Sequence, residues 1–457
     1  MSVIERTTVA MVMLNSVSTA MMLTGVNVAL PEIARDLDLD AITLSWLPMS
    51  YLLASAACVL GFGRLADMYG RKRIYLIGTF AIVVTSVYAS LSTSAIHLLI
   101  ARVGQGIGAG MVFATNVAIV SSVFPPKSRG TAIGYTVSAI YLGLTLGPVL
   151  GGILIQYTSW RATFLLHLPL AAVVLFLGLL KIKKEWRSQE QGYFDAFGFL
   201  IYGASIVVLT IGLTKIPAST GVSLAILGLV GLVVFFRYEL GQKYPIFDAA
   251  LFYSNRMFLM SCLASLLIYT ATFSNVVLVS LFLQYLKGLN PFHAGLVMMI
   301  QPAIMTVLSP WAGRLADRKE PKLLASLGIG ITGVGLGVFS FLSAGSEMVG
   351  VVLCLALTGV GFSLFTTPNA NAIMGAVTKS DFGRAASAIS AMRVWGQLAS
   401  MGLVAMMLAL FLGPVRISPD VYPALQSAIQ YCFFFAACLC VFGVFLSWAR
   451  GSNQEEA

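Results

Sequence analysis

The sequence predicts an all-α polytopic membrane protein, built from two six-helix bundles with two more helices inserted between them. Three observations support this. Of the 457 residues, 58% are hydrophobic and 10% charged, whereas soluble proteins carry about 25% charged residues. Apolar stretches of about 20 residues, enough to cross a bilayer, recur along the chain, and the mean hydropathy is +0.90. The pentapeptide GRLAD occurs twice, at 63–67 and 313–317, which indicates an internal repeat.

We interpret fourteen apolar stretches as membrane-spanning helices, because the ten-residue alternation of a membrane β-barrel is absent from the sequence. The first stretch continues past the small residues 18–20 to Leu30, so we expect a retained helix and not a cleaved signal peptide. The predicted spans are residues 8–30, 43–65, 74–93, 96–121, 130–155, 162–181, 195–214, 221–238, 257–285, 291–313, 322–343, 347–370, 384–412 and 424–448.

The basic residues predict which way the spans are oriented. If connecting segments alternate between the two sides, 21 of the 28 Lys and Arg residues lie on the side of the N-terminus and five on the other. Arg102 and Arg393 remain within spans. Positive charge gathers in cytoplasmic loops, so we expect a multi-pass protein of the plasma membrane of a bacterium or archaeon, with both termini cytoplasmic. The net charge of +10 then reflects topology and not nucleic-acid binding.

The repeat also predicts the domain organisation. Both pentapeptides fall in cytoplasmic turns, after spans 2 and 10, so each marks the same position of a six-helix unit. Two such units form a transporter whose site lies at their interface near the bilayer midplane. We expect an N-terminal bundle at 1–181, a middle segment at 182–256 and a C-terminal bundle with a short cytoplasmic tail at 257–457. The middle segment holds a cytoplasmic linker, inserted helices 7 and 8, and an amphipathic connector.

Four motifs resemble those of the major facilitator superfamily, in its fourteen-helix drug:proton antiporter branch. Residues 63–73 (GRLADMYGRKR) are similar to the family's loop signature, and residues 102–108 (RVGQGIG) to its second motif. The antiporter motif of span 5 is matched in spacing and identity, and residues 244–256 resemble the segment that follows the inserted pair. The matched residues of span 5 are Gly134, Gly143, Gly147, Pro148, Gly151 and Gly152.

The resemblance covers nearly the whole chain and implies a major-facilitator fold. It further implies a secondary transporter for multidrug-type efflux of amphipathic small molecules, which works by alternating access. The proton gradient would be the driving force, without a cofactor, and the protein would act as a monomer in the lipid bilayer.

The loop motif contains the predicted gate. Asp67 ends span 2, and a carboxylate there can lie against the positive end of another helix. The resemblance implies that this helix is span 13, so that the contact closes the cytoplasmic side. The alternative is that these charges only fix the topology. The gating candidates are Gly63, Asp67, Gly70 and Arg71, with Gly313 and Asp317 in the second copy, which lacks the glycine that follows.

Span 5 carries glycines at every fourth residue. Gly143, Gly147 and Gly151 therefore form a groove that lets another helix approach closely, and Pro148 favours a kink. Helix packing alone explains this pattern. The resemblance implies in addition a seam between the two bundles.

Two arginines within spans are candidates for coupling. Arg102 lies about six residues inside span 4, where a charge is costly unless it faces a cavity or a partner; the alternative is snorkelling to the surface. Gln105 shares its helical face. The resemblance implies that Arg102 tunes the protonation of a nearby carboxylate. Arg393 in span 13 is the second candidate.

The chain departs from the family in its first helix, where Met22 occupies the position of the membrane aspartate. All eighteen acidic residues fall in termini, loops or span ends. Histidine side chains titrate near neutrality, so His167 can either couple protons or pack as a hydrogen-bonded histidine. The other titratable candidates are His97, His293 and the rim acids Glu32, Asp36 and Asp195.

Polar and aromatic residues on the central spans are candidates for the substrate cavity. We expect fewer than half to contact substrate, because many such residues form hydrogen bonds between helices. Aromatic, methionine and amide side chains beside two arginines favour neutral or anionic amphipathic solutes over dications. The candidates are Asn15, Thr19, Met22, Trp46, Tyr51, Asn116, Tyr135, Tyr141, Tyr269, Asn275, Gln301, Thr367 and Asn369.

Other functions are open at this point. A lipid or metabolite transporter of the same fold, with facilitative or different coupling, would account for the missing carboxylate. A receptor or scaffold is disfavoured, because it would not need a releasable gate. An enzyme is disfavoured too, because the sequence shows no catalytic motif and no metal-ligand spacing, and its six cysteines all lie in apolar runs.

Overall fold

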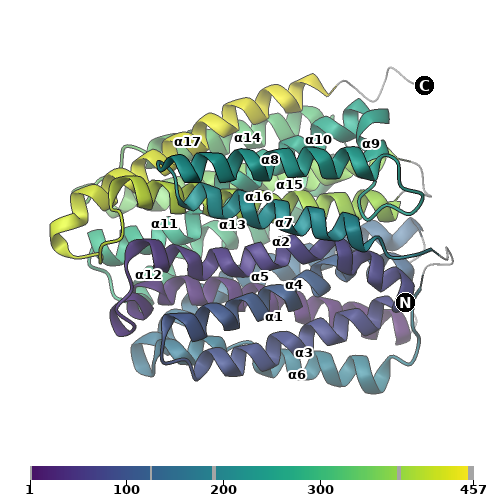
Figure 1. Cartoon of the computed structure of the whole chain (residues 1–457), viewed down its shortest axis with the longest axis horizontal. Coiled ribbons are helices and arrows are strands. Elements are labelled where there is room, and N and C mark those ends of the chain that lie inside the picture. The colour runs from purple at the N-terminus through teal and green to yellow at the C-terminus, as the bar shows by residue number, and fades with distance from the viewer. Residues whose placement is uncertain (1–2, 124–125, 188–191, 317, 378–381, 451–457) are drawn as a thin grey trace.

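The computed structural model describes residues 3–123, 126–187, 192–316, 318–377 and 382–450. Its long helices run side by side, and α1 begins at the same end of the bundle at which α17 ends (Figure 1). We call this end the terminal end and the opposite one the far end. The first helices are α1 (Val3–Asp36), α2 (Ala41–Tyr69), α3 (Arg71–Ser90), α4 (Ala95–Val123), α5 (Pro126–Tyr157), η1 (Trp160–Phe164), α6 (Leu168–Phe176) and η2 (Leu177–Lys181).

The remaining helices follow a linker. They are α7 (Ala196–Thr214), α8 (Ser219–Glu239), α9 (Ala249–Ser254), α10 (Arg256–Thr272), α11 (Asn275–Leu281), η3 (Phe282–Leu286), α12 (Pro291–Met298), α13 (Ile300–Ala316), α14 (Pro321–Phe339), α15 (Met348–Gly375), α16 (Phe382–Phe411), η5 (Pro419–Val421) and α17 (Tyr422–Ala449). Within the described ranges, fourteen segments are long and apolar enough to cross a membrane. The predicted number of spans is therefore confirmed.

Span ends differ from the prediction where polar residues cap or extend a helix. The first helix continues to Asp36, six residues beyond its apolar run. The side chains of Asp40, Asn255 and Asn290 accept hydrogen bonds from backbone N–H groups in the first turns of α2, α10 and α12. Such N-caps satisfy donors that have no partner within the helix. Hydropathy does not detect them, because capping residues are themselves polar.

Helix packing repeats between the first six and the last six spans. In the first set, α1 packs on α5, α2 and α3 pack on α4, and α3 packs on α6. In the second set the corresponding pairs are α10 with α16, α13 and α14 with α15, and α14 with α17. The inserted pair α7 and α8 pack on each other, and α7 also contacts α2 and α16. We call the two sets the first and second bundles.

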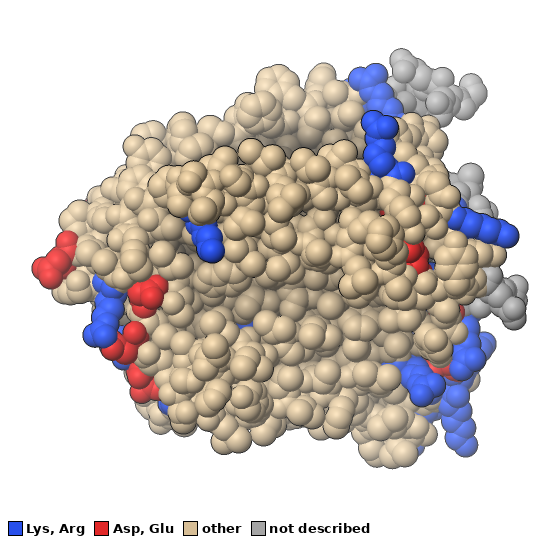
Figure 2. Space-filling view, viewed as in Figure 1, with Lys and Arg blue, Asp and Glu red and all other residues tan. Residues whose placement is uncertain are grey.

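The charges lie mainly at the two ends of the molecule. Figure 2 shows Lys, Arg, Asp and Glu side chains mainly at the terminal and far ends, with a broad belt between them that has few charged side chains. Many large apolar side chains on the helices are exposed, among them Phe80 of α3 and Phe442 of α17. An apolar belt of this kind is the surface that a bilayer covers.

Candidate functional site

The glycines of α5 bring two helices of the first bundle together. A Cβ on Gly143 would lie 2.5 Å from the carbonyl oxygen of Val17, and one on Gly151 would lie 2.9 Å from the Cα of Gly25, both on α1. A Cβ on Gly134 would meet nothing within 4 Å in the described part of the chain. The predicted groove is thus filled by α1.

The contact between the bundles comes from another face of the same helix. A Cβ on Gly152 would lie 2.6 Å from the carbonyl oxygen of Pro291 at the start of α12. On α12, a Cβ on Gly295 would overlap the carbonyl oxygen of Pro148. Pro148 and Gly152 therefore lie where α5 of the first bundle meets α12 of the second.

Further contacts join the two bundles at the far end. Gln284 Nε2 donates to the carbonyl oxygen of Val28 at 2.9 Å. The backbone N–H of Ala41 donates to the carbonyl oxygen of Val415 at 2.9 Å, and Asp38 forms an ion pair with Arg416. In this conformation the bundles are held together at the far end.

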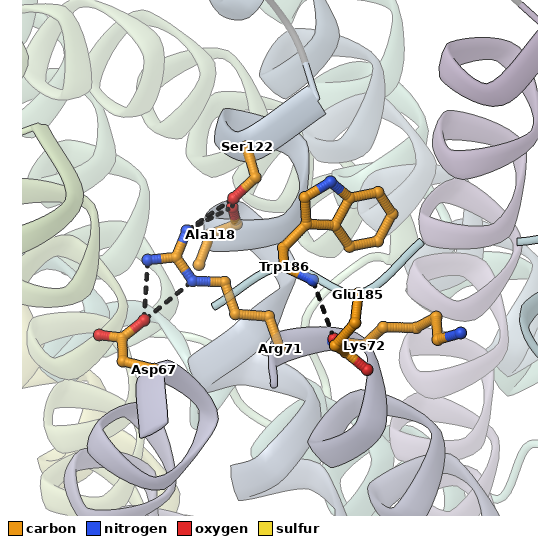
Figure 3. A network of polar contacts seen from close by, with 7 residues as sticks. All are labelled: Asp67, Arg71, Lys72, Ala118, Ser122, Glu185 and Trp186. Atoms are coloured by element: carbon orange, nitrogen blue, oxygen red, sulfur yellow. Dashed lines mark hydrogen bonds and ion pairs between the residues drawn. The ribbon is translucent and has the colours of Figure 1, made fainter. Parts of the chain in front are cut away.

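The loop motif at the terminal end is held within the first bundle (Figure 3). Arg71 Nη2 lies 2.7 Å from Asp67 Oδ1, and Arg71 Nη1 donates to Ser122 Oγ at the end of α4 at 2.6 Å. Glu185 of the linker accepts from the backbone N–H of Lys72 at 2.8 Å. The motif therefore ties the turn between α2 and α3 to α4 and to the linker.

Gly70 is required in this turn for two reasons. Its φ of 120° is a backbone conformation that other residues rarely adopt, and a Cβ there would lie 2.6 Å from the side chain of Glu185. Sequence reasoning missed Glu185, although it is the one acid within the basic run 181–187.

The predicted contact of Asp67 with span 13 stays a prediction. Arg384, near the start of α16, pairs with Asp248 of the connector at 3.1 Å. In the second copy, a Cβ on Gly313 would lie 3.3 Å from Thr367, whereas Asp317 lies outside the described residues.

Arg102 lies in the interior of the first bundle and is fully buried. Its Nε donates to the carbonyl oxygen of Leu47 at 3.0 Å, and its Nη1 donates to Gln105 Oε1 at 2.8 Å. The guanidinium carbon lies 4.7 Å from the ring centre of Tyr51. An arginine stays charged even when buried. These three groups therefore stabilise the positive charge of Arg102, which has no carboxylate partner among the described residues.

Gln105 connects Arg102 to His167. Gln105 Nε2 donates to Ser86 Oγ at 2.8 Å, and Ser86 Oγ lies 2.9 Å from His167 Nε2. Ser18 Oγ lies 3.3 Å from His167 Nδ1 and donates to the His167 carbonyl oxygen. Ser18 and Ser86 therefore contact the two ring nitrogens of His167, and which nitrogen donates depends on the tautomer of the imidazole. We call these five residues the buried polar network.

Met22 contacts the buried polar network. Its Sδ lies 3.9 Å from Ser86 Oγ, so the position of the family's aspartate adjoins the serine that joins His167 to Gln105. Sequence reasoning missed Ser86, because a lone serine in an apolar helix carries no distinctive pattern. The other two histidines, His97 and His293, are exposed.

Arg393 of α16 lies against the first bundle. Its guanidinium carbon is 5.2 Å from the ring centre of Phe113 on α4, and its charge acts on the hydroxyls of Tyr51, Tyr141 and Tyr269. These five residues, which we call the central cluster, come from α2, α4, α5, α10 and α16. Phe113 was not predicted, although it follows Arg102 by eleven residues, about three helical turns, and so shares its face.

The remaining cavity candidates fall into two groups. Four have hydrogen bonds within their bundles: Asn15 with Thr79, Thr19 with the Asn15 carbonyl, Asn116 with Ser16, and Asn369 with Ser265 and Arg450. Burial lowers the pKa of Arg450 to about 10 and Glu320 opposes this shift, so Arg450 stays charged at neutral pH.

In the second group, Asn275 is buried and its amide has no hydrogen-bond partner among the described residues. The side chains of Trp46, Gln301 and Thr367 are partly buried, and Tyr135 is exposed. Hydrogen bonds within the protein therefore explain why the four residues of the first group are polar. The residues of the second group remain candidates for contact with the substrate.

Two acids lie buried at the terminal end of the inserted pair. Asp195 Oδ1 caps α7 through the backbone N–H of Gly198 at 2.9 Å, and Glu239 Oε2 accepts from the backbone N–H of Phe247 at 3.2 Å. The second oxygens, Asp195 Oδ2 and Glu239 Oε1, have no partner among the described residues and both face Gly198. Of the other rim acids, Glu32 pairs with Arg35 and Asp36 with Arg161.

Comparison with known proteins places this geometry in a family. Residues 12–261 and 261–456 each match the sequence profile of the Major Facilitator Superfamily. The multidrug resistance protein Stp of Mycobacterium tuberculosis is 30% identical over 89% of this chain and 76% of its own length. The riboflavin transporter RibZ of Clostridioides difficile is 29% identical over 80% of each chain.

The fold comparison agrees with the sequence comparison. A bacterial homolog of the human lysosomal transporter Spinster superposes with a TM-score of 0.71 over 98% of this chain and 97% of that chain, at 14% sequence identity. The predicted fold class is thereby confirmed, and the family assigns a transporter and not an enzyme. The chain belongs to the Major Facilitator Superfamily, as a fourteen-helix membrane transporter.

Proposed function

We propose that this protein exports amphipathic small molecules by alternating access, with both termini in the cytoplasm. The observation that carries the proposal is the distribution of contacts between the bundles. Asp38–Arg416 and Gln284–Val28 join them at the far end, while Asp67 pairs inside its own bundle at the terminal end. This arrangement supports a conformation closed to the outside, whose cytoplasmic gate would form when the bundles tilt the other way.

The relatives support the kind of solute. One is named for multidrug resistance and another for transport of riboflavin, a planar aromatic molecule. A central cluster of three tyrosines, a phenylalanine and an arginine is suited to planar aromatic solutes, since aromatic rings prefer stacked or edge-to-face contacts. The excess of Lys and Arg on one side supports cytoplasmic termini.

Proton coupling through His167 is part of the proposal. His167 Nε2 lies 2.9 Å from Ser86 Oγ, and we propose that the imidazole is neutral in this conformation, because the charge of Arg102 at the other end of the buried polar network opposes a second positive charge. A proton on Nε2 would require the Ser86 hydroxyl to turn towards Met22. A deprotonated site is what a proton antiporter needs when it faces the cytoplasm, where it releases its proton and takes up its solute.

Transport by purified protein in proteoliposomes tests the proposal. We expect a pH gradient to drive accumulation of planar aromatic solutes, and we expect a protonophore to abolish it. Replacing His167 with Gln keeps a hydrogen-bonding side chain but removes the titration, so gradient-driven transport should be lost while counterflow without a gradient persists. His97→Gln, at an exposed histidine, is the matched control. Accumulation that is unchanged by the protonophore would refute proton coupling.

A transporter with facilitative coupling is the second candidate function. The observation in its favour is that no carboxylate adjoins the buried polar network in the described residues, where Met22 replaces the family's aspartate. The same assay separates the two candidates. A facilitative transporter equilibrates its solute across the membrane at any pH gradient, whereas an antiporter accumulates it.

A further inference from the structure

The position of Arg393 calls for a partner that the described residues do not supply. The side chain is partly buried where α16 meets the first bundle, and an aromatic ring, that of Phe113, faces its guanidinium. No carboxylate pairs with it within the described ranges. A charge at this depth in a membrane protein normally faces another charge or lines a pathway for solutes.

A second positive charge lies on the same face of α4, about three helical turns from Phe113. Arg102 is fully buried and its Nη2 has no hydrogen-bond acceptor among the described residues. Tyr51 lies in the field of both arginines: its ring covers Arg102, and Arg393 also acts on its hydroxyl. That hydroxyl is buried and has no partner in the described part of the chain.

We propose that Arg393, with the hydroxyl of Tyr51, forms the binding site for the anionic group of an aromatic solute. The inference rests on the proposed transport function and narrows its substrates to amphipathic organic anions such as aromatic carboxylates and sulfonates. Arg393 supplies planar N–H donors that match a carboxylate or sulfonate. Arg102 does not reach the solute; it raises the positive potential behind Tyr51.

The aromatic residues supply the second part of the site. Phe113, Tyr141 and Tyr269 come from three helices around Arg393, so a ring system attached to the anionic group would lie against them. A cationic solute of the same shape would meet two positive charges in a medium of low dielectric constant, where their repulsion is strong. The site therefore selects by charge among solutes of equal size.

A pair of dyes that share one xanthene frame tests this selection. Fluorescein carries an anionic group and rhodamine 123 is a cation, and their binding to the protein in lipid nanodiscs can be followed by fluorescence anisotropy. We expect the wild-type protein to bind fluorescein at least about tenfold more tightly than rhodamine 123, as loss of a charge-assisted hydrogen bond would imply. Equal affinity for the two dyes would overturn the proposal without any variant.

Variants locate the site. Arg393→Gln should weaken fluorescein binding about tenfold or more. Arg393→Lys keeps the charge without the planar N–H donors and should weaken binding by less than Arg393→Gln, and Tyr51→Phe should weaken it severalfold because only the hydroxyl is removed. Arg237→Gln, at an exposed arginine of α8, is the matched control. Fluorescein binding that is unchanged in both Arg393→Gln and Tyr51→Phe would overturn the assignment to these residues.

Binding in nanodiscs needs no gradient, so this result is separate from the transport proposal. If fluorescein binds as predicted and no solute accumulates in proteoliposomes, the anion-binding site is supported and active export is refuted. If neutral and cationic solutes accumulate while fluorescein is not bound, export stands and the anion site falls.

Discussion

Replacing Gly143 with alanine tests whether the groove of α5 sets its distance from α1. The added Cβ would lie 2.5 Å from the carbonyl oxygen of Val17 and 2.8 Å from the Cβ of Ala20. Ordinary carbon contacts lie at about 3.5–4 Å, so the two helices must separate by roughly an ångström. Because the first obstacle is backbone, no side-chain rotation can relieve it.

The size of the effect follows from two opposing terms. Overpacking a well-packed interface costs about 1–3 kcal/mol, and a rigid backbone obstacle places Gly143→Ala in the upper part of that range. Alanine is the better helix former by up to about 1 kcal/mol. We therefore expect the free energy of unfolding to fall by about 1–2 kcal/mol. In Gly134→Ala the new Cβ has no neighbour among the described residues, so only the better helix propensity of alanine applies and the free energy of unfolding should not fall.

Denaturant unfolding in detergent micelles, followed by circular dichroism, measures the difference. Ala20→Gly removes one of the two overlaps, so Gly143→Ala should cost less stability in the Ala20→Gly background than in the wild-type protein. If Gly143→Ala unfolds at the same denaturant concentration as Gly134→Ala, α1 does not fill the groove as described.

Three further predictions concern the interface, the buried polar network and the inserted pair. Gly152→Ala pushes α5 from Pro291 and weakens far-end closure, so amide hydrogen exchange in residues 412–418 should become faster. Met22→Asp puts a carboxylate beside the network, and everted vesicles should gain export of the cation ethidium. Glu239 Oε1 is buried without a hydrogen-bond partner among the described residues, where a charged carboxylate is costly, so we expect Glu239→Gln to remove an infrared band of a protonated carboxyl group at neutral pH.

Each of these has a control and a contradicting result. Gly134→Ala should leave exchange in residues 412–418 unchanged, and slower exchange in Gly152→Ala would contradict the first prediction. Met22→Asn keeps the size without the charge, and ethidium export by this variant would show that charge is not the cause. A carboxyl band that persists in Glu239→Gln would mean that the proton lies elsewhere.

Much of the fold follows from sequence because bilayer thickness and loop charge act on long, uniform segments. The fourteen spans, the repeat and the family motifs are of this kind. Helix ends are less predictable, since a single residue such as Asp40 decides them by capping. The glycine spacing in span 5 likewise predicts a groove and not which helix fills it, because α1 is more than a hundred residues away in sequence.

Residues of the candidate site could be predicted from the sequence where their side chain is energetically costly at that position in a membrane span. Arg102 and Arg393 stand out because charges are rare within spans, and Tyr51, Tyr141 and Tyr269 because they lie on central helices. The residues of the central cluster come from five helices, so the fact that they interact cannot be derived from the sequence of any one helix. Asn369 shows the opposite case: it is polar within a span, and its partner Arg450 lies beyond the last helix.

The hydroxyl of Tyr202 gives the inserted pair a mechanical consequence. It donates to the Ala56 carbonyl oxygen on α2 and accepts from Trp395 Nε1 on α16. One side chain of α7 is thus hydrogen-bonded to both the first and the second bundle. On that flank the two bundles are therefore joined to each other through α7. We therefore expect this flank to open less than the flank where α5 packs on α12 and α13.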